Sequence, residues 1–438
     1  MLRRLMMTAS VAALTLFTLP SAAHAQRAAD ARTTPTVQRG TPISAGMSAK
    51  RLDHITATFK KEVAEKKLPG AVIMIARKGR LVYAEAFGLR DPKGSDPMRT
   101  DSIFRIYSMT KPFASVAIML LVEDGLIQLT DPVAKYIPSM KDVKVSSASG
   151  DVTAERAPTV QDLLRHTAGL AYGEITKNEK VKTALVAAGF AKPGVIDFDA
   201  RDMTGPQQAE RIGTIPLVNQ PGTVWEYSLA SDILGRVVEA ASGKRLGDFL
   251  AERVFGPLRM TDTAFFVPAA KAGRLAEPFD KDPATGTVSK LIDVSKQPGN
   301  DSGGAGAVST AMDYLRFSQM LFNGGNLDGQ RVMSRTTIRL MTSDHLGSLV
   351  SNPHAPGELG LGTKGYTFGL GFAVRMANGL AGVPGSAGEY TWAGYGGTYF
   401  WVDPAEQIAA VYMTQAPSPA RAAYRRLLRQ LVYQAIVD

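Results

Sequence analysis

Residues 104–113 read Phe-Arg-Ile-Tyr-Ser-Met-Thr-Lys-Pro-Phe and contain a Ser-x-x-Lys pair, Ser108 and Lys111, that occurs nowhere else in the chain. Residues 114–123 are mostly apolar helix formers, so the sequence predicts a helix that begins near Ser108. Pro112 suits a first helical turn, where its missing N–H has no partner to lose. On such a helix the side chains of Ser108 and Lys111 lie on one face, one turn apart.

The two residues are suited to act as a nucleophile and a nearby base. A serine at a helix N-terminus lies among free backbone N–H groups and at the positive end of the helix dipole. A lysine packed among Ile106, Phe113 and Val116 loses hydration, which makes it a candidate base. A serine here is also compatible with a simple N-cap, so the assignment depends on partners elsewhere in the chain.

The composition is that of a globular protein long enough for two domains. The chain has 438 residues, of which 45% are hydrophobic and 21% charged. It contains no cysteine, which excludes disulfides, thiolate nucleophiles and cysteine-ligated metal sites. The formal charge is +10, and the basic residues are scattered along the chain. This distribution indicates a solvated surface, and we expect no nucleic-acid partner.

The first residues are typical of a secretion signal. Arg3 and Arg4 precede an apolar run at 9–19 that is too short to span a bilayer, and Ala23-His-Ala25 has the small-x-small cleavage pattern. We expect a signal peptide over 1–25 and a secreted or periplasmic chain without a stable membrane span; a retained anchor is the alternative. Residues 26–46 are rich in Thr, Pro, Ala and Gly and predict a flexible leader.

Hydrophobic periodicity predicts an α/β (α+β) fold with a helical insert. Helical spacing appears over 48–67 and in most of 158–268. Strand-like runs lie at 71–76, 81–87, 369–375, 398–403 and 407–414. We therefore expect an α/β sheet domain formed by 47–155 and 300–438, an all-α domain formed by 156–299, and a cleft at their junction.

A tail helix is predicted over 420–437. Its arginines, Arg421, Arg425, Arg426 and Arg429, are on or near the polar side, which indicates a solvated face rather than a binding patch.

A conventional Ser-His-Asp hydrolase is disfavoured. The chain has no Gly-x-Ser-x-Gly elbow, and only four histidines follow the signal. Of these, we expect His166 to be a structural residue at a helix end.

Two other stretches are candidate parts of the site. Tyr227 lies on a loop before a helix that begins near Leu229; its phenol, beside a cationic lysine, can act as general base and later as general acid, although a packing aromatic is the alternative. Residues 390–398 read Tyr-Thr-Trp-Ala-Gly-Tyr-Gly-Gly-Thr, and their small side chains let backbone approach a ligand closely. This segment offers an oxyanion donor to accompany the N–H of Ser108, or is simply a glycine-rich hairpin.

In this order and with these separations, the three stretches resemble the serine β-lactamase and penicillin-binding-protein family, and most of all its class C enzymes and family VIII carboxylesterases. Ser108-x-x-Lys111 is similar to the nucleophile motif and Tyr227-Ser-Leu to the tyrosine motif, while Trp392-Ala393-Gly394 stands at the place of the Lys-Thr-Gly strand motif. The resemblance extends over about residues 47–433. It implies an antiparallel sheet flanked by helices, an inserted all-α domain and an active site between them.

The resemblance also implies a mechanism. Ser108 attacks an acyl carbonyl, the Lys111–Tyr227 pair draws off its proton, and the N–H groups of Ser108 and Tyr395 face the oxyanion. An acyl-enzyme forms and water releases it, with no metal or other cofactor.

Two positions depart from the class C pattern. Leu229 replaces an asparagine and Trp392 replaces a lysine, so neither side chain can bind the polar groups of a β-lactam in the usual way. We expect a secreted serine carboxylesterase whose partner is a small acyl ester of short or medium chain, with Trp392, Ala393, Gly394, Tyr395 and Leu229 as substrate contacts. The alternatives are a β-lactamase, a D-amino-acid peptidase, an acyltransferase or a non-catalytic cell-wall sensor.

Overall fold

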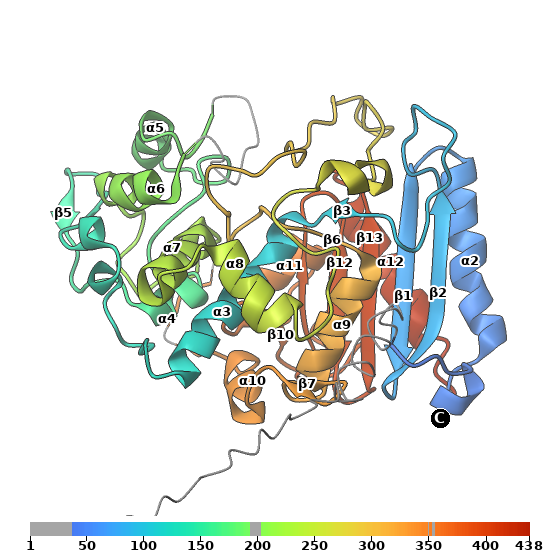
Figure 1. Ribbon diagram of the computed structural model, residues 1–438. Helices are drawn as coiled ribbons and strands as arrows, with labels where there is room; N and C mark the ends of the chain where they lie inside the picture. Colours follow the sequence, from blue (N-terminus) through green and yellow to red (C-terminus); the bar gives the residue numbers. More distant parts are fainter. Residues whose placement is uncertain (1–36, 193–202, 349, 353–354) are drawn as a thin grey trace, which may run out of the picture. The chain divides into compact units, whose positions relative to one another are not determined.

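A seven-stranded antiparallel sheet forms the centre of the fold (Figure 1), with the strand order β2-β1-β13-β12-β11-β10-β9. The computed structural model describes residues 37–192, 203–348, 350–352 and 355–438, so the predicted signal peptide lies outside the described residues. The strands are β1 (Gly70–Arg77), β2 (Arg80–Gly88), β9 (Tyr366–Phe368), β10 (Ala373–Arg375), β11 (Tyr390–Ala393), β12 (Tyr399–Asp403) and β13 (Ile408–Thr414). The first hairpin therefore pairs with the last strand, as β1 does with β13.

Helices cover both faces of the sheet (Figure 1): α9 (Ala311–Phe322) on one, α2 (Ala49–Ala64) and α12 (Arg421–Tyr433) on the other. The alternation of side chains along β12 explains this arrangement. The ring of Phe400 lies 4.9 Å from that of Tyr314 in α9. Its neighbour Trp401 points the opposite way, with the guanidinium of Arg429 in α12 5.2 Å from its ring. The predicted α/β (α+β) class is confirmed.

A group of helices packs around α7 (Ala230–Ser242), which contacts α3 (Lys111–Glu123), α4 (Val160–Leu164), α6 (Gly205–Arg211) and α8 (Leu246–Leu250). Their boundaries follow the sequence signals. Thr159 caps α4, Thr204 caps α6, and Gly243 ends α7 in the left-handed conformation at φ 70°. Residues 37–438 form one compact unit, and the division at 156–299 stays a prediction.

The remaining elements are short. They are η2 (Ile43–Ala45), β3 (Phe104–Arg105), η3 (Tyr107–Thr110), η4 (Val133–Lys135), η5 (Pro138–Met140), β4 (Lys144–Val145), β5 (Val152–Thr153), α5 (Glu179–Ala187), η6 (Ile212–Thr214), the π-helix η7 (Ala251–Phe255), η8 (Ala269–Arg274), β6 (Val308–Ser309), β7 (Asn326–Leu327), β8 (Gln330–Arg331), α10 (Arg335–Met341) and α11 (Pro356–Leu361). No helix within the described ranges is long and apolar enough to cross a lipid bilayer.

Part of the predicted flexible leader is packed. Among its described residues, 37–46, Val37 and Ala45 are buried, and the N–H of Gly40 donates to the carbonyl of Leu81 in β2. Pairing with an edge strand holds this segment, although its own sequence has no apolar period. The predicted strand at 369–375 is likewise divided: only its last residues belong to β10, because Gly371 turns the chain at φ 96°.

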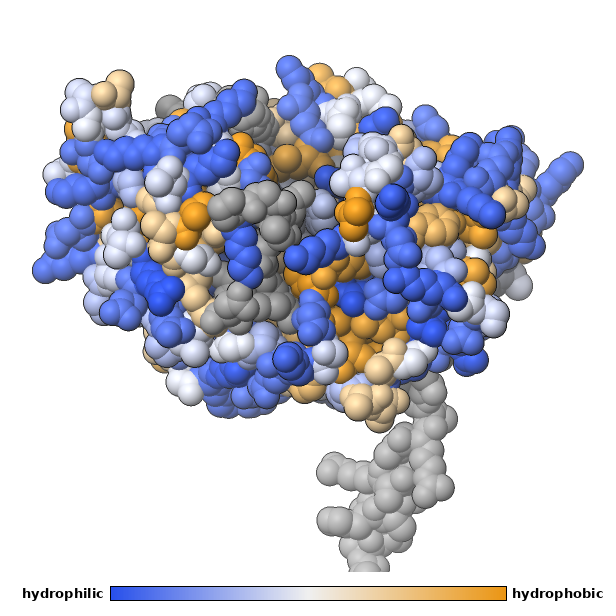
Figure 2. All heavy atoms as spheres, turned by 90° about the horizontal axis from the view of Figure 1, so that it is seen from above, coloured by the Kyte–Doolittle hydropathy of each residue, from blue (hydrophilic) through white to orange (hydrophobic). Residues whose placement is uncertain are grey.

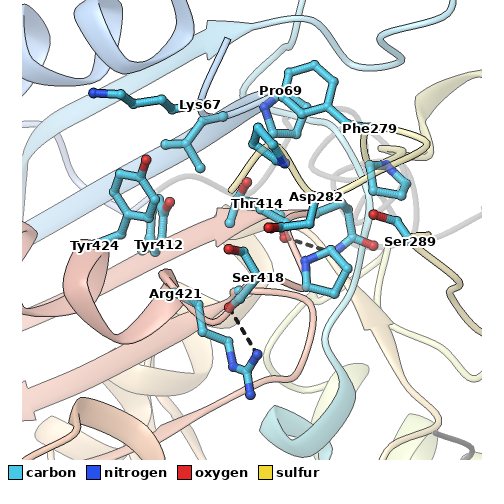
Figure 3. A pocket seen from close by; sticks show the side chains of 17 residues that line it. Lys67, Pro69, Phe279, Asp282, Ser289, Tyr412, Thr414, Ser418, Arg421 and Tyr424 are labelled. Atoms are coloured by element: carbon cyan, nitrogen blue, oxygen red, sulfur yellow. Dashed lines mark hydrogen bonds between the residues drawn. The ribbon is translucent and has the colours of Figure 1, made fainter. Parts of the chain in front are cut away.

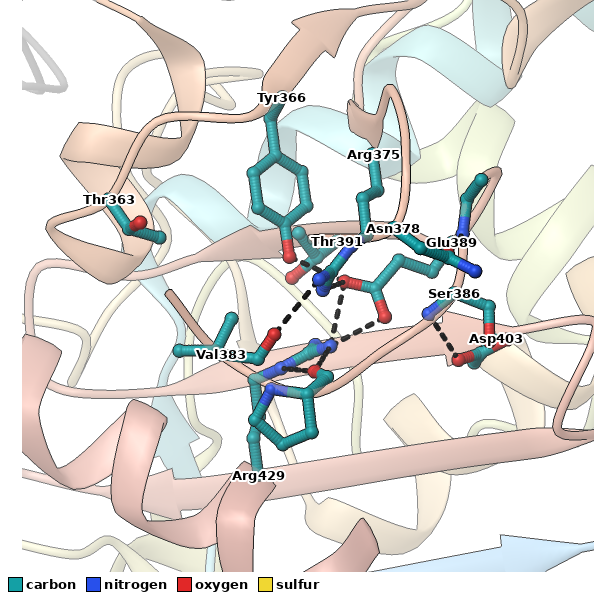
Figure 4. Close-up of polar contacts among 12 residues, drawn as sticks. Thr363, Tyr366, Arg375, Asn378, Val383, Ser386, Glu389, Thr391, Asp403 and Arg429 are labelled. Carbon is teal, nitrogen blue, oxygen red and sulfur yellow. Dashed lines mark hydrogen bonds and ion pairs between the residues drawn. The ribbon is translucent and has the colours of Figure 1, made fainter. Parts of the chain in front are cut away.

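The prediction of a solvated arginine face on the tail helix is wrong for two of its members. Arg425 and Arg429 are 1% and 0% exposed, because they lie on the side of α12 that faces the sheet. Figure 4 shows the guanidinium of Arg429 beside the carboxylate of Glu389. Nη2 donates to Oε1 at 2.7 Å. Buried charge is tolerated here because it is paired, and the partner is 40 positions away in the sequence.

Candidate active site

Ser108 lies in a tight 3-10 turn, η3, between β3 and α3. The expected α-helix begins later, at Lys111, with Pro112 in its first turn. Tyr107, directly before Ser108, has φ 45°, a left-handed conformation that costs a non-glycine residue about 1–2 kcal/mol. Strain of this kind persists only where the surroundings enforce it, and it often marks functional sites. The turn places the Ser108 side chain on the wall of a cavity.

Tyr227 is the nearest partner of Ser108. The two hydroxyl groups are hydrogen-bonded, with 2.7 Å between Tyr227 Oη and Ser108 Oγ. Neighbouring rings fix the phenol: the ring of Trp392 lies 5.4 Å from it and that of His166 5.1 Å. The phenol oxygen is therefore held at the distance required for proton exchange with Ser108.

Lys111 lies behind Tyr227, and its side chain is 1% exposed. Its Nζ donates to the hydroxyl of Tyr172 at 2.9 Å and to the carbonyl of Gly304 at 2.8 Å. The same nitrogen is 4.8 Å from the centre of the Tyr227 ring. A cation at this distance can stabilise negative charge that develops on the phenol during catalysis.

Two residues that support Lys111 were missed in the sequence. Tyr172 is a lone tyrosine in a loop, and nothing in its surroundings marks it. Asp232 accepts hydrogen bonds from the Ser302 hydroxyl and, at 3.2 Å, from the N–H of Gly304, whose carbonyl binds Lys111. Burial raises the pKa of Asp232, while the charge of Lys111 opposes that rise. The only sequence signal for Asp232 was its position five residues after Tyr227, at the start of α7.

The end of β11 closes the site from the sheet side. Gly394 packs so closely on the turn of Ser108 that a Cβ there would lie 2.3 Å from the carbonyl oxygen of Ile106. Only glycine allows this approach. The ring of Tyr395 packs edge-on against Tyr107 at 5.4 Å. The backbone of Tyr395 is thereby fixed against the turn that carries the nucleophile.

Most of the predicted site residues meet around one cavity of about 110 Å³. Ser108, Tyr227, Trp392, Ala393, Gly394 and Tyr395 line it. Sequence reasoning missed the others, Ile175, Leu359, Gly360, Arg421 and Arg425. Ile175 and Leu359 are each 38% exposed, so the mouth is partly apolar. Figure 2 shows a face on which apolar side chains gather near the middle, with hydrophilic ones over most of the periphery.

Leu229 does not join this group. It is 3% exposed, precedes α7 and packs in the hydrophobic core, away from the cavity wall. His166 is also buried, and its Nδ1 lies 3.2 Å from the hydroxyl of Ser228 rather than near Ser108. Burial, and then the charge of Lys111, lower the pKa of His166 well below its usual value. A neutral, enclosed imidazole fits the expected structural role.

Arg421 brings a cation into the cavity that the sequence reasoning did not expect. Its guanidinium donates to the carbonyl of Ser418 at 3.0 Å and lies 5.3 Å from the ring centre of Tyr395. No carboxylate of the described residues forms an ion pair with it. Figure 3 shows that Arg421 also borders a second, smaller cavity near Asp282 and Ser418. The loss of a lysine at Trp392 therefore does not leave the site without positive charge.

Comparison with known proteins agrees with this geometry. Residues 55–434 match the Beta-lactamase family. The chain is 34% identical over 379 residues to Protein Rv1367c of Mycobacterium tuberculosis, covering 83% of this chain and 90% of that one. It is 31% identical over 394 residues to Esterase EstB of Burkholderia gladioli, covering 85% and 91%.

Among solved structures, the fold is similar to EstCE1, described as a hydrolase with promiscuous acyltransferase activity. The TM-score is 0.73 at 26% identity, and the match covers 88% of this chain and 99% of EstCE1. The predicted β-lactamase-like architecture is confirmed, and the chain belongs to the Beta-lactamase family.

Proposed function

We propose that this serine hydrolase is an exported carboxylesterase that forms an acyl-enzyme on Ser108. The observation that carries the proposal is the 2.7 Å contact between Ser108 Oγ and the phenol oxygen of Tyr227. Ser108 is the nucleophile, Tyr227 is its base, and Lys111 is a cation behind the base; none of these roles is filled by a histidine. In a serine esterase the nucleophile must reach the carbonyl carbon of the ester while the base takes its proton.

The reaction follows from these positions. Ser108 Oγ attacks the ester carbonyl and passes its proton to the Tyr227 oxygen, whose anionic form Lys111 stabilises. The negative charge on the carbonyl oxygen is held by the N–H groups of Ser108 and Tyr395. The carbon–oxygen bond then breaks, and the alcohol leaves with the proton from Tyr227. Water repeats the sequence on the acyl-enzyme, giving the acid and free Ser108.

The cavity wall favours esters with apolar parts. Trp392 stands where a lysine would bind a substrate carboxylate, and Ile175 and Leu359 add apolar surface at the mouth. The relative named Esterase EstB supports this substrate class. The cavity of about 110 Å³ suits short or medium acyl groups.

β-Lactam hydrolysis is the second candidate, since Arg421 offers a guanidinium to the carboxylate that such substrates carry. The same acyl-enzyme would serve a D-amino-acid peptidase. It would also serve an acyltransferase, an activity that the description of EstCE1 includes.

Export is part of the proposal and rests on the sequence of residues 1–25. We expect the chain to mature at about Gln26 and to act outside the cytoplasm. N-terminal sequencing of the protein from a periplasmic extract tests this; an intact Met1 terminus would contradict it.

Hydrolysis assays distinguish the activities. We expect short- and medium-chain p-nitrophenyl esters to be cleaved by the wild type and not by Ser108→Ala. A chromogenic cephalosporin should be a poorer substrate than the best ester. Inactivity of the wild type on every acyl substrate would refute the hydrolase proposal, and a much faster cephalosporin reaction would refute the ester preference.

A further inference from the structure

Arg425 is a buried cation at the active site whose hydrogen bonds all go to backbone carbonyls. Its side chain lies in α12 and is 1% exposed. Nη2 donates to the carbonyl of Gly394 at 2.6 Å and to that of Thr398 at 3.2 Å, while Nη1 donates to that of Gly360 at 2.9 Å. No acidic side chain of the described residues forms an ion pair with it.

Burying the charged guanidinium of Arg425 lowers the stability of the fold, so stability does not explain why an arginine stands at this position. Burial, and then the charge of Arg421, lower the pKa of Arg425 to about 9, so the guanidinium remains cationic at neutral pH. An apolar side chain of similar length would fill the same space without the cost of desolvating a charge. The next arginine on this face, Arg429, has the carboxylate of Glu389 to compensate its charge, whereas no carboxylate in the described part of the chain pairs with Arg425. The hydrogen bonds of Arg425 are therefore directed at the carbonyls, and its guanidinium also lies 5.9 Å from the ring centre of Tyr399.

The shortest of these contacts falls on the peptide group between Gly394 and Tyr395. No cis peptide bond occurs among the described residues, so the C=O of Gly394 and the N–H of Tyr395 point in opposite directions. The carbonyl accepts from Arg425 at 2.6 Å and, more weakly, from the N–H of Gly397 at 3.1 Å, so the N–H of Tyr395 is turned away from α12. A cationic donor on the carbonyl also polarises the amide, which strengthens its N–H as a donor.

The other contacts fix the segment around that peptide. Thr398 accepts from the N–H of Gly394 at 2.9 Å, so Arg425 binds both ends of the turn that follows β11. Gly360 belongs to α11, next to Leu359 on the cavity wall. One guanidinium therefore joins the strand end, its turn and α11 around Ser108.

We propose that Arg425 is a positioning residue for the oxyanion site. It orients and polarises the 394–395 peptide so that the N–H of Tyr395 stabilises the negative charge that forms when Ser108 attacks a carbonyl. This inference rests on the proposed function, since it assigns Arg425 a role in the same acyl transfer. It predicts a defect in transition-state stabilisation rather than in substrate affinity.

Three variants with graded chemistry test it. Arg425→Lys keeps the charge, Arg425→Gln keeps a neutral donor, and Arg425→Met keeps only the volume. Arg426→Met is the matched control, because Arg426 lies on the same helix, donates to the carbonyl of Leu361 and does not line the cavity. For a p-nitrophenyl ester we expect kcat to fall about 100-fold in Arg425→Met, as for loss of an oxyanion donor, with KM changed less than about threefold.

An alkylboronic acid supplies a second readout. Ser108 Oγ adds to boron, and the tetrahedral, negatively charged adduct places an oxygen at the oxyanion site. Its affinity should fall in parallel with kcat, in the order wild type, Arg425→Lys, Arg425→Gln, Arg425→Met, while Arg426→Met resembles the wild type.

The outcomes separate the two claims. A wild type that neither cleaves esters nor binds the boronate at Ser108 would overturn the proposed function and this inference together. An active wild type with an Arg425→Met variant of unchanged kcat and boronate affinity would overturn only the role of Arg425. If Arg425→Met does not fold, Arg425→Lys and Arg425→Gln decide: equal kcat in both would show that the charge has no role.

Discussion

Tyr227 Oη lies 2.7 Å from Ser108 Oγ, although 119 positions separate the two residues in the chain. Tyr227 stands on the loop before α7, and Ser108 lies in the turn before α3. These two helices pack against each other, so the packing of α3 on α7 sets the distance between nucleophile and base. The proton transfer from Ser108 therefore depends on the contact between these two helices.

Removal of the phenol oxygen should abolish most of the activity. In Tyr227→Phe the ring keeps its aromatic neighbours, while Ser108 loses the group that takes its proton. We expect kcat for a p-nitrophenyl ester to fall about 10²–10⁴-fold, the usual contribution of a general base, with little change in Tm. Steady-state kinetics and thermal unfolding of the purified variant measure both. Retention of more than about a tenth of wild-type kcat would contradict the assignment of Tyr227 as base.

Tyr172 should matter through Lys111. In Tyr172→Phe the ammonium keeps the Gly304 carbonyl but loses a hydrogen bond of 2.9 Å, and an unsatisfied buried group costs about 1–3 kcal/mol. We expect kcat to fall about tenfold and the unfolding free energy to fall within that range. Tyr136→Phe is the control, since its hydroxyl binds Asp131 away from the cavity. Equal kcat values for the two variants would argue against a role for Tyr172.

Arg421 should select for negatively charged esters. A guanidinium without a carboxylate partner gains a charge-assisted hydrogen bond from an anionic substrate group. In Arg421→Gln, we expect kcat/KM for a carboxylate-bearing ester to fall about tenfold relative to that for a neutral ester of the same length. The ratio should stay unchanged in Arg426→Gln. If the Arg421→Gln variant keeps the wild-type ratio, Arg421 does not contact the substrate.

Local signals in the sequence predicted most of the elements. The cap at Ser48, the apolar stripe after it and the left-handed Gly243 each act within a few residues, so α2 and the end of α7 could be predicted from the sequence. The Ser108–Lys111 pair is local too. Its union with Tyr227 and the end of β11 depends on long-range packing, and it was expected only because the order of the three stretches resembles a known family.

The wrong predictions also arise from contacts between residues that are far apart in the sequence. Arg425 was expected on a solvated face because a helix pattern reports polarity, whereas its partners are carbonyls of residues 31 and 65 positions away. Residues 37–46 have no apolar period of their own, and they pack because an edge strand offers hydrogen bonds. Leu229 was expected in the site because Tyr227-Ser-Leu resembles a family motif, whereas the turn before α7 directs this side chain into the core.

The stability of the fold at acid pH tests the role of Asp162, whose carboxylate supports the loop that carries His166. Burial alone would raise the pKa of Asp162, but hydrogen bonds from Arg156 and Thr159 lower it from 3.8 to about 2. The folded-state pKa lies below the unfolded value, so the carboxylate stabilises the fold above about pH 4, and this contribution is lost as the pH falls towards 2.

The shift corresponds to about 2 kcal/mol at pH 7. We expect Asp162→Asn to lower the Tm at pH 7, and the difference from the wild type to narrow between pH 4 and pH 2. The exposed carboxylate of Asp53 in α2 gives the control Asp53→Asn, with no expected change. A Tm difference that is independent of pH would show that the charge of Asp162 does not stabilise the fold.

Mass spectrometry of the acyl-enzyme shows which residue carries the acyl group. The protein is mixed with a p-nitrophenyl ester, quenched in acid within the first turnovers, and measured intact and after proteolysis. We expect a mass increase equal to one acyl group, located on the peptide that contains Ser108, and none in Ser108→Ala. An acyl group on another residue, or its persistence in Ser108→Ala, would show that Ser108 is not the nucleophile.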